Sequence, residues 1–138
     1  MRRRVKFGLI LVAGLTLAWA HQPSTHNPVR LPTDLVIESR HATWEQKREN
    51  KRIAKHYAWA GFGWKGKEWL CLHDLWMRES RFDHLADNPK SSAFGIAQLL
   101  GERDPRPRTQ ILRGLKYIRE RHLTPCGALV FHNKRGHY

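Results

Sequence analysis

Acidic residues are scarce in this sequence. Its 12 Asp and Glu residues stand against 25 Lys and Arg residues in a chain of 138, which gives a formal net charge of +13 at pH 7. A surplus of this size favours an anionic partner and speeds association with it, but it supplies no chemistry. The length allows one small domain once a terminal targeting segment is set aside.

Long hydrophobic runs are also missing. The longest mainly apolar stretch runs from Phe7 to Trp19, which is shorter than the about 20 residues that a membrane-spanning helix needs. It follows a basic start and ends at an Ala-Trp-Ala site, so residues 1–20 are predicted to be a secretory signal peptide. An uncleaved membrane anchor is the alternative. We therefore expect a protein that is secreted, or located in the periplasm or cell wall.

Cysteine is nearly absent, with Cys71 and Cys126 as the one pair. In an exported protein an even count favours a disulfide between them, with two buried free thiols as the alternative. The nine His residues contain no His-Glu-x-x-His pattern, and His132 and His137 have the wrong spacing for one helix face. The glycine-rich segment 61–66 lacks the Gly-Lys-Ser/Thr of a phosphate-binding loop. We expect no metal and no cofactor.

No segment alternates apolar and polar residues over a useful length, so the fold is predicted to be mainly α. A short β-hairpin in the loop 83–98 is the one β element that we allow. Residues 21–42 hold three of the seven prolines and are expected to be a flexible linker. The domain then occupies residues 43–138. Its expected helices are 43–59 with a Thr43/Gln46 capping box, 69–80, 110–122 capped by Thr109, and one that starts at Thr124-Pro125 and ends at Gly136.

The first predicted helix is strongly basic on one surface. Its cationic residues are Lys47, Arg48, Lys51, Arg52 and Lys55, and its partial inward face is expected to be Trp44, Ile53, Ala54 and Tyr57. A run of charge like this is typical of a solvated helix face, and it could also hold the domain against an acidic wall. In the third helix Ile111, Leu115 and Ile118 are expected to point inward.

Glu79 stands where a hydrophobic residue is expected. It follows Leu72, Leu75 and Trp76 at the i, i+3, i+4, i+7 spacing of one helix face, and a polar loop comes directly after it. A carboxyl group at the end of a buried face is partly desolvated, which raises its pKa and suits a general acid near neutral pH. The alternative is a side chain that rotates into solvent.

Glu79-Ser80-x-Phe82 and the Ser-Ser-Ala-Phe-Gly-Ile-Ala-Gln-Leu of residues 91–99 resemble the signature of the soluble lytic transglycosylases, in their goose-type-lysozyme-like fold. The Trp-x-Cys-Leu-x-x-Leu-Trp-x-x-Glu-Ser of residues 69–80, a Pro125-Cys126 pair and a terminal Gly-x-Tyr are closer to one branch. That branch is the short secreted actinobacterial type, which includes the C-terminal domains of aggregation-promoting factors. The resemblance covers roughly residues 47–138.

This resemblance implies a small lysozyme-like domain that cleaves the β-1,4 bond between N-acetylmuramic acid and N-acetylglucosamine in peptidoglycan strands. One Glu, here Glu79, acts first as acid and then as base, and the C6 hydroxyl of muramic acid closes on its own C1. The other site residues that it implies are Ser80, Phe94, Gly95, Gln98, His132, Asn133 and Tyr138. Phe94 and Gly95 would line the saccharide groove and Gln98 would hydrogen-bond the substrate. His132 stands where the family has a tyrosine, and Ser92 replaces its usual loop glycine.

Two other functions of this fold stay open. Outside this fold, a basic protein that disrupts membranes is a third possibility, and the export signal weighs against one that binds nucleic acid. A hydrolytic muramidase would need a second carboxylate, for which Asp83 and Asp87 are candidates, although both occupy positions typical of turn and cap hydrogen bonds. A non-catalytic cell-wall-binding protein of the same fold would use its basic helix instead. In each case we expect a monomer that meets peptidoglycan and other anionic envelope polymers rather than nucleic acid.

Overall fold

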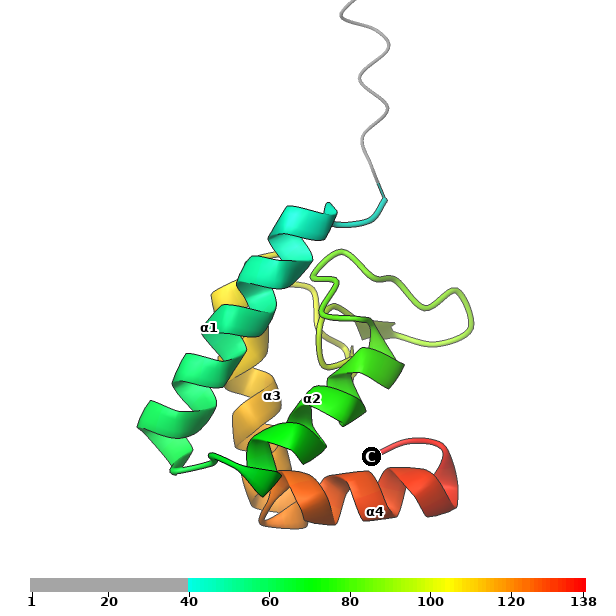
Figure 1. Ribbon diagram of the computed structural model, residues 1–138. Coiled ribbons are helices and arrows are strands. Elements are labelled where there is room, and N and C mark those ends of the chain that lie inside the picture. Colours follow the sequence, from blue (N-terminus) through cyan, green and yellow to red (C-terminus); the bar gives the residue numbers. More distant parts are fainter. Residues whose placement is uncertain (1–39) are drawn as a thin grey trace, which may run out of the picture. The chain divides into compact units, whose positions relative to one another are not determined.

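The computed structural model describes residues 40–138. The predicted signal peptide and residues 21–39 of the predicted linker lie outside the described residues. Within the described part there are four helices and a small antiparallel hairpin that lies to one side of them (Figure 1), which confirms a mainly α domain with a short hairpin. The elements are α1 (Trp44–Phe62), α2 (Lys67–Glu79), β1 (Ala93–Phe94), β2 (Leu99–Leu100), α3 (Pro107–His122) and α4 (Pro125–Arg135).

The helices form two packed pairs. Helix α1 packs against α3, and α2 packs against α4; α3 also contacts α4 (Figure 1). None of the described helices is both long enough and apolar enough to cross a bilayer.

Local capping signals placed three of the helix ends correctly. Thr43 forms the predicted capping box with Gln46, Thr124 caps α4 by accepting from the Gly127 amide, and Gly136 ends α4 in a left-handed conformation. The prediction that Thr109 caps the third helix is wrong. That helix starts at Pro107, because a proline fits the first helical position, where no N–H partner is needed.

The core is built on the apolar face of α2. Leu72, Leu75 and Trp76 are fully buried as predicted, and they meet Ile111, Leu115 and Ile118 of α3. Gly114 allows α3 to lie this close, since a Cβ there would come within 2.7 Å of the Ala97 Cβ and 2.8 Å of the Trp76 ring. Tight packing of this kind fixes the orientation of α2 and therefore the position of its last residue, Glu79.

The inward face of α1 matches the prediction in part. Ala54 is fully buried and Ile53 and Tyr57 pack partly buried against the core, whereas Trp44 is 66% exposed. Asn50 and Ala58, which we did not expect on this face, are also buried. Small residues let α1 lie close to the rest of the domain. The large aromatic residue at the start of α1 is therefore free to face solvent.

The hairpin is held over α3 by one buried glutamine. Ala93 and Phe94 pair with Leu100 and Leu99, so the second strand begins one residue beyond the loop in which we expected it. The Gln110 side chain accepts from the Ile96 amide and donates to the carbonyls of His84 and Asp104. Gly95 covers this glutamine at φ 76°, and a Cβ there would lie 2.3 Å from Gln110 Oε1.

Asp83 joins the start of the domain to the loop after α2. Its buried carboxylate accepts from the Ala42 and Leu85 amides and lies 3.0 Å from Lys47 Nζ. Burial alone would raise the pKa of this group, but these hydrogen bonds outweigh it and lower the pKa below its usual value. Ala42 is buried, so the contacts of the domain begin inside the segment that we assigned to the linker.

The predicted disulfide is present. Cys71 and Cys126 are bonded, with their Cα atoms 5.0 Å apart, and they join α2 to α4 across 55 residues. The Cys126 amide also donates to Glu68 of α2. This end of the α2–α4 pair is therefore fixed both covalently and by hydrogen bonding.

Candidate active site

Glu79 is the last residue of α2, and it lies at the edge of a cleft. Its side chain is 16% exposed, which rules out the alternative of an acid turned into bulk solvent. Burial raises the pKa of Glu79 to about 7, since a carboxylate loses hydration energy in this position. A carboxyl group with this pKa holds its proton in a large fraction of molecules at neutral pH, as a general acid requires.

His132 of α4 is the polar partner of Glu79. Its Nε2 lies 3.1 Å from Glu79 Oε1, and its buried Nδ1 has no hydrogen-bond partner among the described residues. Because Nδ1 has no hydrogen-bond partner in reach, we assign the ring hydrogen to Nε2, the nitrogen that lies next to Glu79. Burial, and after it the charge of Arg78, lowers the pKa of His132, so this ring is neutral at pH 7. The second oxygen of Glu79 remains for the acidic proton.

Tyr138 closes the site from the C-terminal side, where the chain runs between α2 and α4 (Figure 1). Its hydroxyl accepts from Trp76 Nε1 at 2.9 Å and donates to the Ala97 carbonyl at 2.9 Å. Burial, and after it the charge of Glu79, raises the pKa of Tyr138 well above its usual value, so the hydroxyl stays protonated. Tyr138 therefore fixes the hairpin to α2 beside the acid.

The cleft beside Glu79 has a volume of about 770 Å³, which is within the usual range for ligand sites in proteins. The hairpin and its loop form one wall, and α3 and the C-terminal residues form the other. Its lining residues are Glu79, Asn88, Ser91, Ala93, Gln98, Leu99, Leu100, Tyr117, Arg121, Gly136, His137 and Tyr138. Glu79 is the one acidic residue among these described lining residues.

The predicted site residues divide into two groups. Glu79, Gln98 and Tyr138 line the cleft, whereas the others do not. The Gln98 amide group donates to the carbonyls of Ala86 and Gly95, so it holds the loop as well as facing the cleft.

The remaining predicted residues lie around the cleft and are not among its lining residues. Ser80 donates to the Ile96 carbonyl at 2.7 Å and so ties the hairpin to the end of α2. Asn133 accepts from Arg78 Nη1 at 2.7 Å on the surface. Phe94 pairs in the hairpin and Gly95 covers Gln110.

Sequence reasoning missed the wall supplied by α3. Tyr117 and Arg121 lie one helical turn apart and both reach the cleft. The guanidinium carbon of Arg121 lies 5.9 Å from the centre of the Tyr117 ring. Their i, i+4 spacing placed them on one face, but nothing local indicated that this face would meet the hairpin.

No second carboxylate joins Glu79 in the described cleft. Asp83 is committed to its own hydrogen bonds at the start of the domain, as its turn-type position favoured, and Asp87 forms a bridge pair with Phe94. Two-carboxylate chemistry would need a second acid that faces the same bond.

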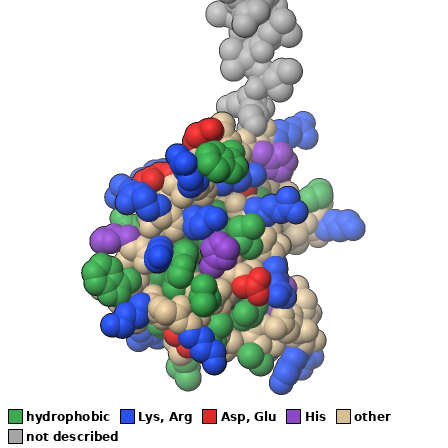
Figure 2. All heavy atoms as spheres, in the orientation of Figure 1, with side chains coloured by type: hydrophobic (Ala, Val, Ile, Leu, Met, Phe, Trp, Pro, Cys, Tyr) green, Lys and Arg blue, Asp and Glu red, His purple; other side chains and the backbone are tan. Residues whose placement is uncertain are grey.

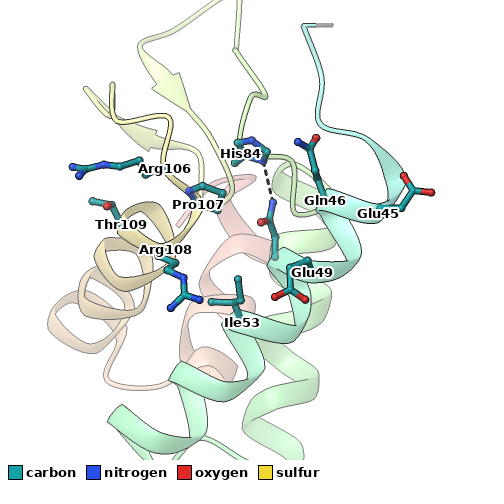
Figure 3. Close-up of a pocket in the computed structure, with 10 residues that line it drawn as sticks. Glu45, Gln46, Glu49, Ile53, His84, Arg106, Pro107, Arg108 and Thr109 are labelled. Carbon is teal, nitrogen blue, oxygen red and sulfur yellow. Dashed lines mark hydrogen bonds between the residues drawn. The ribbon is translucent and has the colours of Figure 1, made fainter.

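A larger hollow lies elsewhere, between the first half of α1 and the start of α3 (Figure 3), with a volume of about 840 Å³. Its floor holds a hydrogen bond of 3.1 Å between Asn50 and His84. One of its two acids, Glu49, is half exposed, and the hydrogen bonds from Arg52 lower its pKa. Glu49 therefore stays ionised near neutral pH, unlike Glu79.

Comparisons of the chain with protein-family profiles, with curated proteins and with solved structures gave no match. Within residues 40–138, no three His, Cys, Asp or Glu side chains gather closely enough to hold a metal ion. The class that the fold and site define is thus a small, mainly α, disulfide-bonded domain with one desolvated Glu beside a cleft.

Proposed function

We propose that this protein is a peptidoglycan lytic transglycosylase that cleaves the β-1,4 bond between N-acetylmuramic acid and N-acetylglucosamine. The observation that carries the proposal is Glu79, a partly desolvated acid with a pKa of about 7 at the edge of a cleft. The motif resemblance adds the substrate class. The disulfide is compatible with an extracellular location, and we extend the proposal to secretion into the cell wall or periplasm.

In the proposed reaction Glu79 protonates the glycosidic oxygen, and the bond from that oxygen to C1 of the muramic acid breaks. The leaving N-acetylglucosamine keeps the proton as a hydroxyl group, while C1 becomes a cation that the acetamido group of the same sugar stabilises. The Glu79 carboxylate then removes the proton of the C6 hydroxyl, whose oxygen bonds to C1. The products are a 1,6-anhydro sugar and a regenerated acid, and no water is consumed.

His132 supports both halves of this cycle as a positioning residue. Its Nε2 lies 3.1 Å from one oxygen of Glu79, so the other oxygen is left to deliver and recover the proton. Glu79 as the one acid among the described lining residues favours this single-acid route over hydrolysis by two carboxylates.

The test is mass spectrometry of the muropeptides released from purified peptidoglycan by the wild type, Glu79→Gln and Glu120→Gln. Glu120 is exposed and lies outside the cleft, so it controls for the chemical change itself. We expect products lighter by one water than lysozyme products from the wild type and Glu120→Gln, and none from Glu79→Gln. Products with reducing ends would establish a hydrolytic muramidase. Wall binding without any product from the wild type would establish a non-catalytic binding protein.

The pH profile supplies a second test. Glu79 must be protonated to start the reaction, so activity should be steady below about pH 6 and fall as the pH rises through about 7. A rate that is constant from pH 5 to 9 would contradict general-acid catalysis by Glu79.

A further inference from the structure

A second surface of the domain combines positive charge with exposed tryptophan. Trp44, Arg48, Lys51, Lys55 and Trp59 follow one another at intervals of three or four residues, so they form one stripe along α1. The two tryptophans at its ends are 66% and 59% exposed. At the usual rise of an α-helix, the stripe is about 22 Å long.

The cations of this stripe have no acidic partner in the domain. Arg48, Lys51 and Lys55 form no ion pair within residues 40–138; instead, each lies 4.7–5.9 Å from the centre of an aromatic ring. Neighbouring Arg52, by contrast, is paired with Glu49. These three cations of the stripe therefore stay outside the close ion pairs of the described residues.

The stripe borders a groove between α1 and α2, which we call the α1–α2 groove. Three adjoining hollows of about 440, 380 and 540 Å³ make it up, and successive hollows share lining residues. No Asp or Glu lines any of the three. Their lining residues are Trp44, Lys47, Arg48, Lys51, Arg52, Lys55, His56, Trp59, Trp64, Lys65, Gly66, Trp69, Leu70, His73, Met77 and Arg81.

Figure 2 shows this face of the molecule, with Lys and Arg side chains gathered over α1 and hydrophobic side chains between them. The lining of the α1–α2 groove shares no residue with the cleft at Glu79. A ligand held in the groove would therefore leave the cleft open.

We propose that the α1–α2 groove binds a linear anionic glycan polymer, whose sugar units carry repeated phosphate or carboxylate groups. The unpaired cations match the repeated negative charge, and the exposed indole rings offer flat apolar faces for sugar rings. An elongated groove without acidic residues fits an extended chain better than a compact ligand. The groove would hold the domain on such a polymer while the separate cleft acts on another strand.

Two other partners share part of this chemistry. A helix that lies in a lipid surface separates its apolar face from its cationic face, whereas here tryptophan and cations share one stripe. Single-stranded nucleic acid also binds basic, aromatic grooves, but the disulfide favours an oxidising compartment, where envelope glycans are the abundant polyanions. Charge complementarity and this compartment favour the glycan polymer.

The experiment measures binding of purified glycosylated poly(ribitol phosphate) by calorimetry, in the Glu79→Gln background so that no cleavage intervenes. The double variant Lys51→Gln/Lys55→Gln removes two charges from the groove, and Lys90→Gln/Lys134→Gln removes two exposed charges elsewhere. Trp59→Ala removes one exposed ring. Poly(dT) and vesicles that contain phosphatidylglycerol are the competing probes.

We expect the groove double variant to bind the polymer about tenfold more weakly or worse, since each surface cation contributes appreciably to polyanion binding. The control double variant should change by less than twofold, and Trp59→Ala should weaken binding severalfold. Equal losses in the two double variants, tighter binding of poly(dT) or of the vesicles, or no binding of the polymer would each overturn the proposal. Because the assay uses an inactive variant, these results do not depend on whether the catalytic proposal holds.

Discussion

Replacing Glu79 by Gln should make the domain more stable at neutral pH while it abolishes the proposed activity. Gln keeps nearly the same shape beside His132, but it carries no charge to desolvate. Active sites commonly sacrifice stability in this way. The expected gain is measurable whether or not the enzymatic assignment is correct.

The magnitude follows from the pKa of Glu79, which rises from 4.5 to about 7 on folding. The native state then binds the proton more tightly than the unfolded state, so the free energy of unfolding falls as the pH rises from about 4.5 to about 7. Each pKa unit corresponds to about 1.4 kcal/mol, so the loss is at most about 3.5 kcal/mol. This value is an upper bound, because the side chain keeps some contact with water. This is a large share of the about 5–15 kcal/mol that stabilises a small domain.

The assay is urea unfolding of the wild type, Glu79→Gln and Glu120→Gln between pH 4 and 8, without reductant so that the disulfide stays closed. The difference in unfolding free energy between Glu79→Gln and the wild type should grow with pH across that window. The difference for Glu120→Gln should stay flat. A Glu79→Gln difference that does not change with pH would refute the desolvated acid and, with it, the proposed catalytic role.

Three further predictions concern the frame of the site. Cys71→Ser/Cys126→Ser should lower the free energy of unfolding by about 4 kcal/mol, since the bond closes a loop across 55 residues; calorimetry measures this, and an unchanged melting temperature would contradict it. Gly95→Ala should destabilise the domain by more than 2 kcal/mol, because the new Cβ would clash with Gln110. Gly101→Ala has a similar φ but lies in open space, so it should cost only about 1 kcal/mol. Equal urea midpoints for the two variants would disprove the contact. Asp83→Ala should lower the free energy of unfolding by about 3 kcal/mol. Because the lowered pKa of Asp83 stabilises the fold above about pH 4, the wild type loses this stability as the pH falls below that value, and the variant should not. An acid-unfolding curve identical to that of the wild type would contradict this prediction.

The parts of the fold that the sequence predicts correctly are those set by neighbouring residues. Thr43 with Gln46 and Thr124 with Pro125 place helix starts because a cap satisfies backbone groups within one turn. The start of α3 carries two competing signals, Pro107 and Thr109, and the helix begins at the proline. Trp44 was misplaced because spacing does not show which of two faces will meet the rest of the chain.

The candidate site also has a part that the local sequence predicts and a part that depends on distant contacts. Glu79 was found because a charged residue interrupts a local apolar pattern, and its burial follows from the packing of Leu75 and Trp76 before it. The wall formed by Tyr117 and Arg121 depends on how α3 meets the hairpin. That contact is set by Gln110, which bonds to three separate segments, and no spacing along the chain reveals such a link.

The bond between Cys71 and Cys126 makes the geometry of the cleft depend on when the chain is oxidised. The helix that it holds carries His132, and the segment after that helix carries Tyr138, so both neighbours of Glu79 belong to the covalently fixed end of the chain. Before the thiols are oxidised, only non-covalent packing would hold these groups in place.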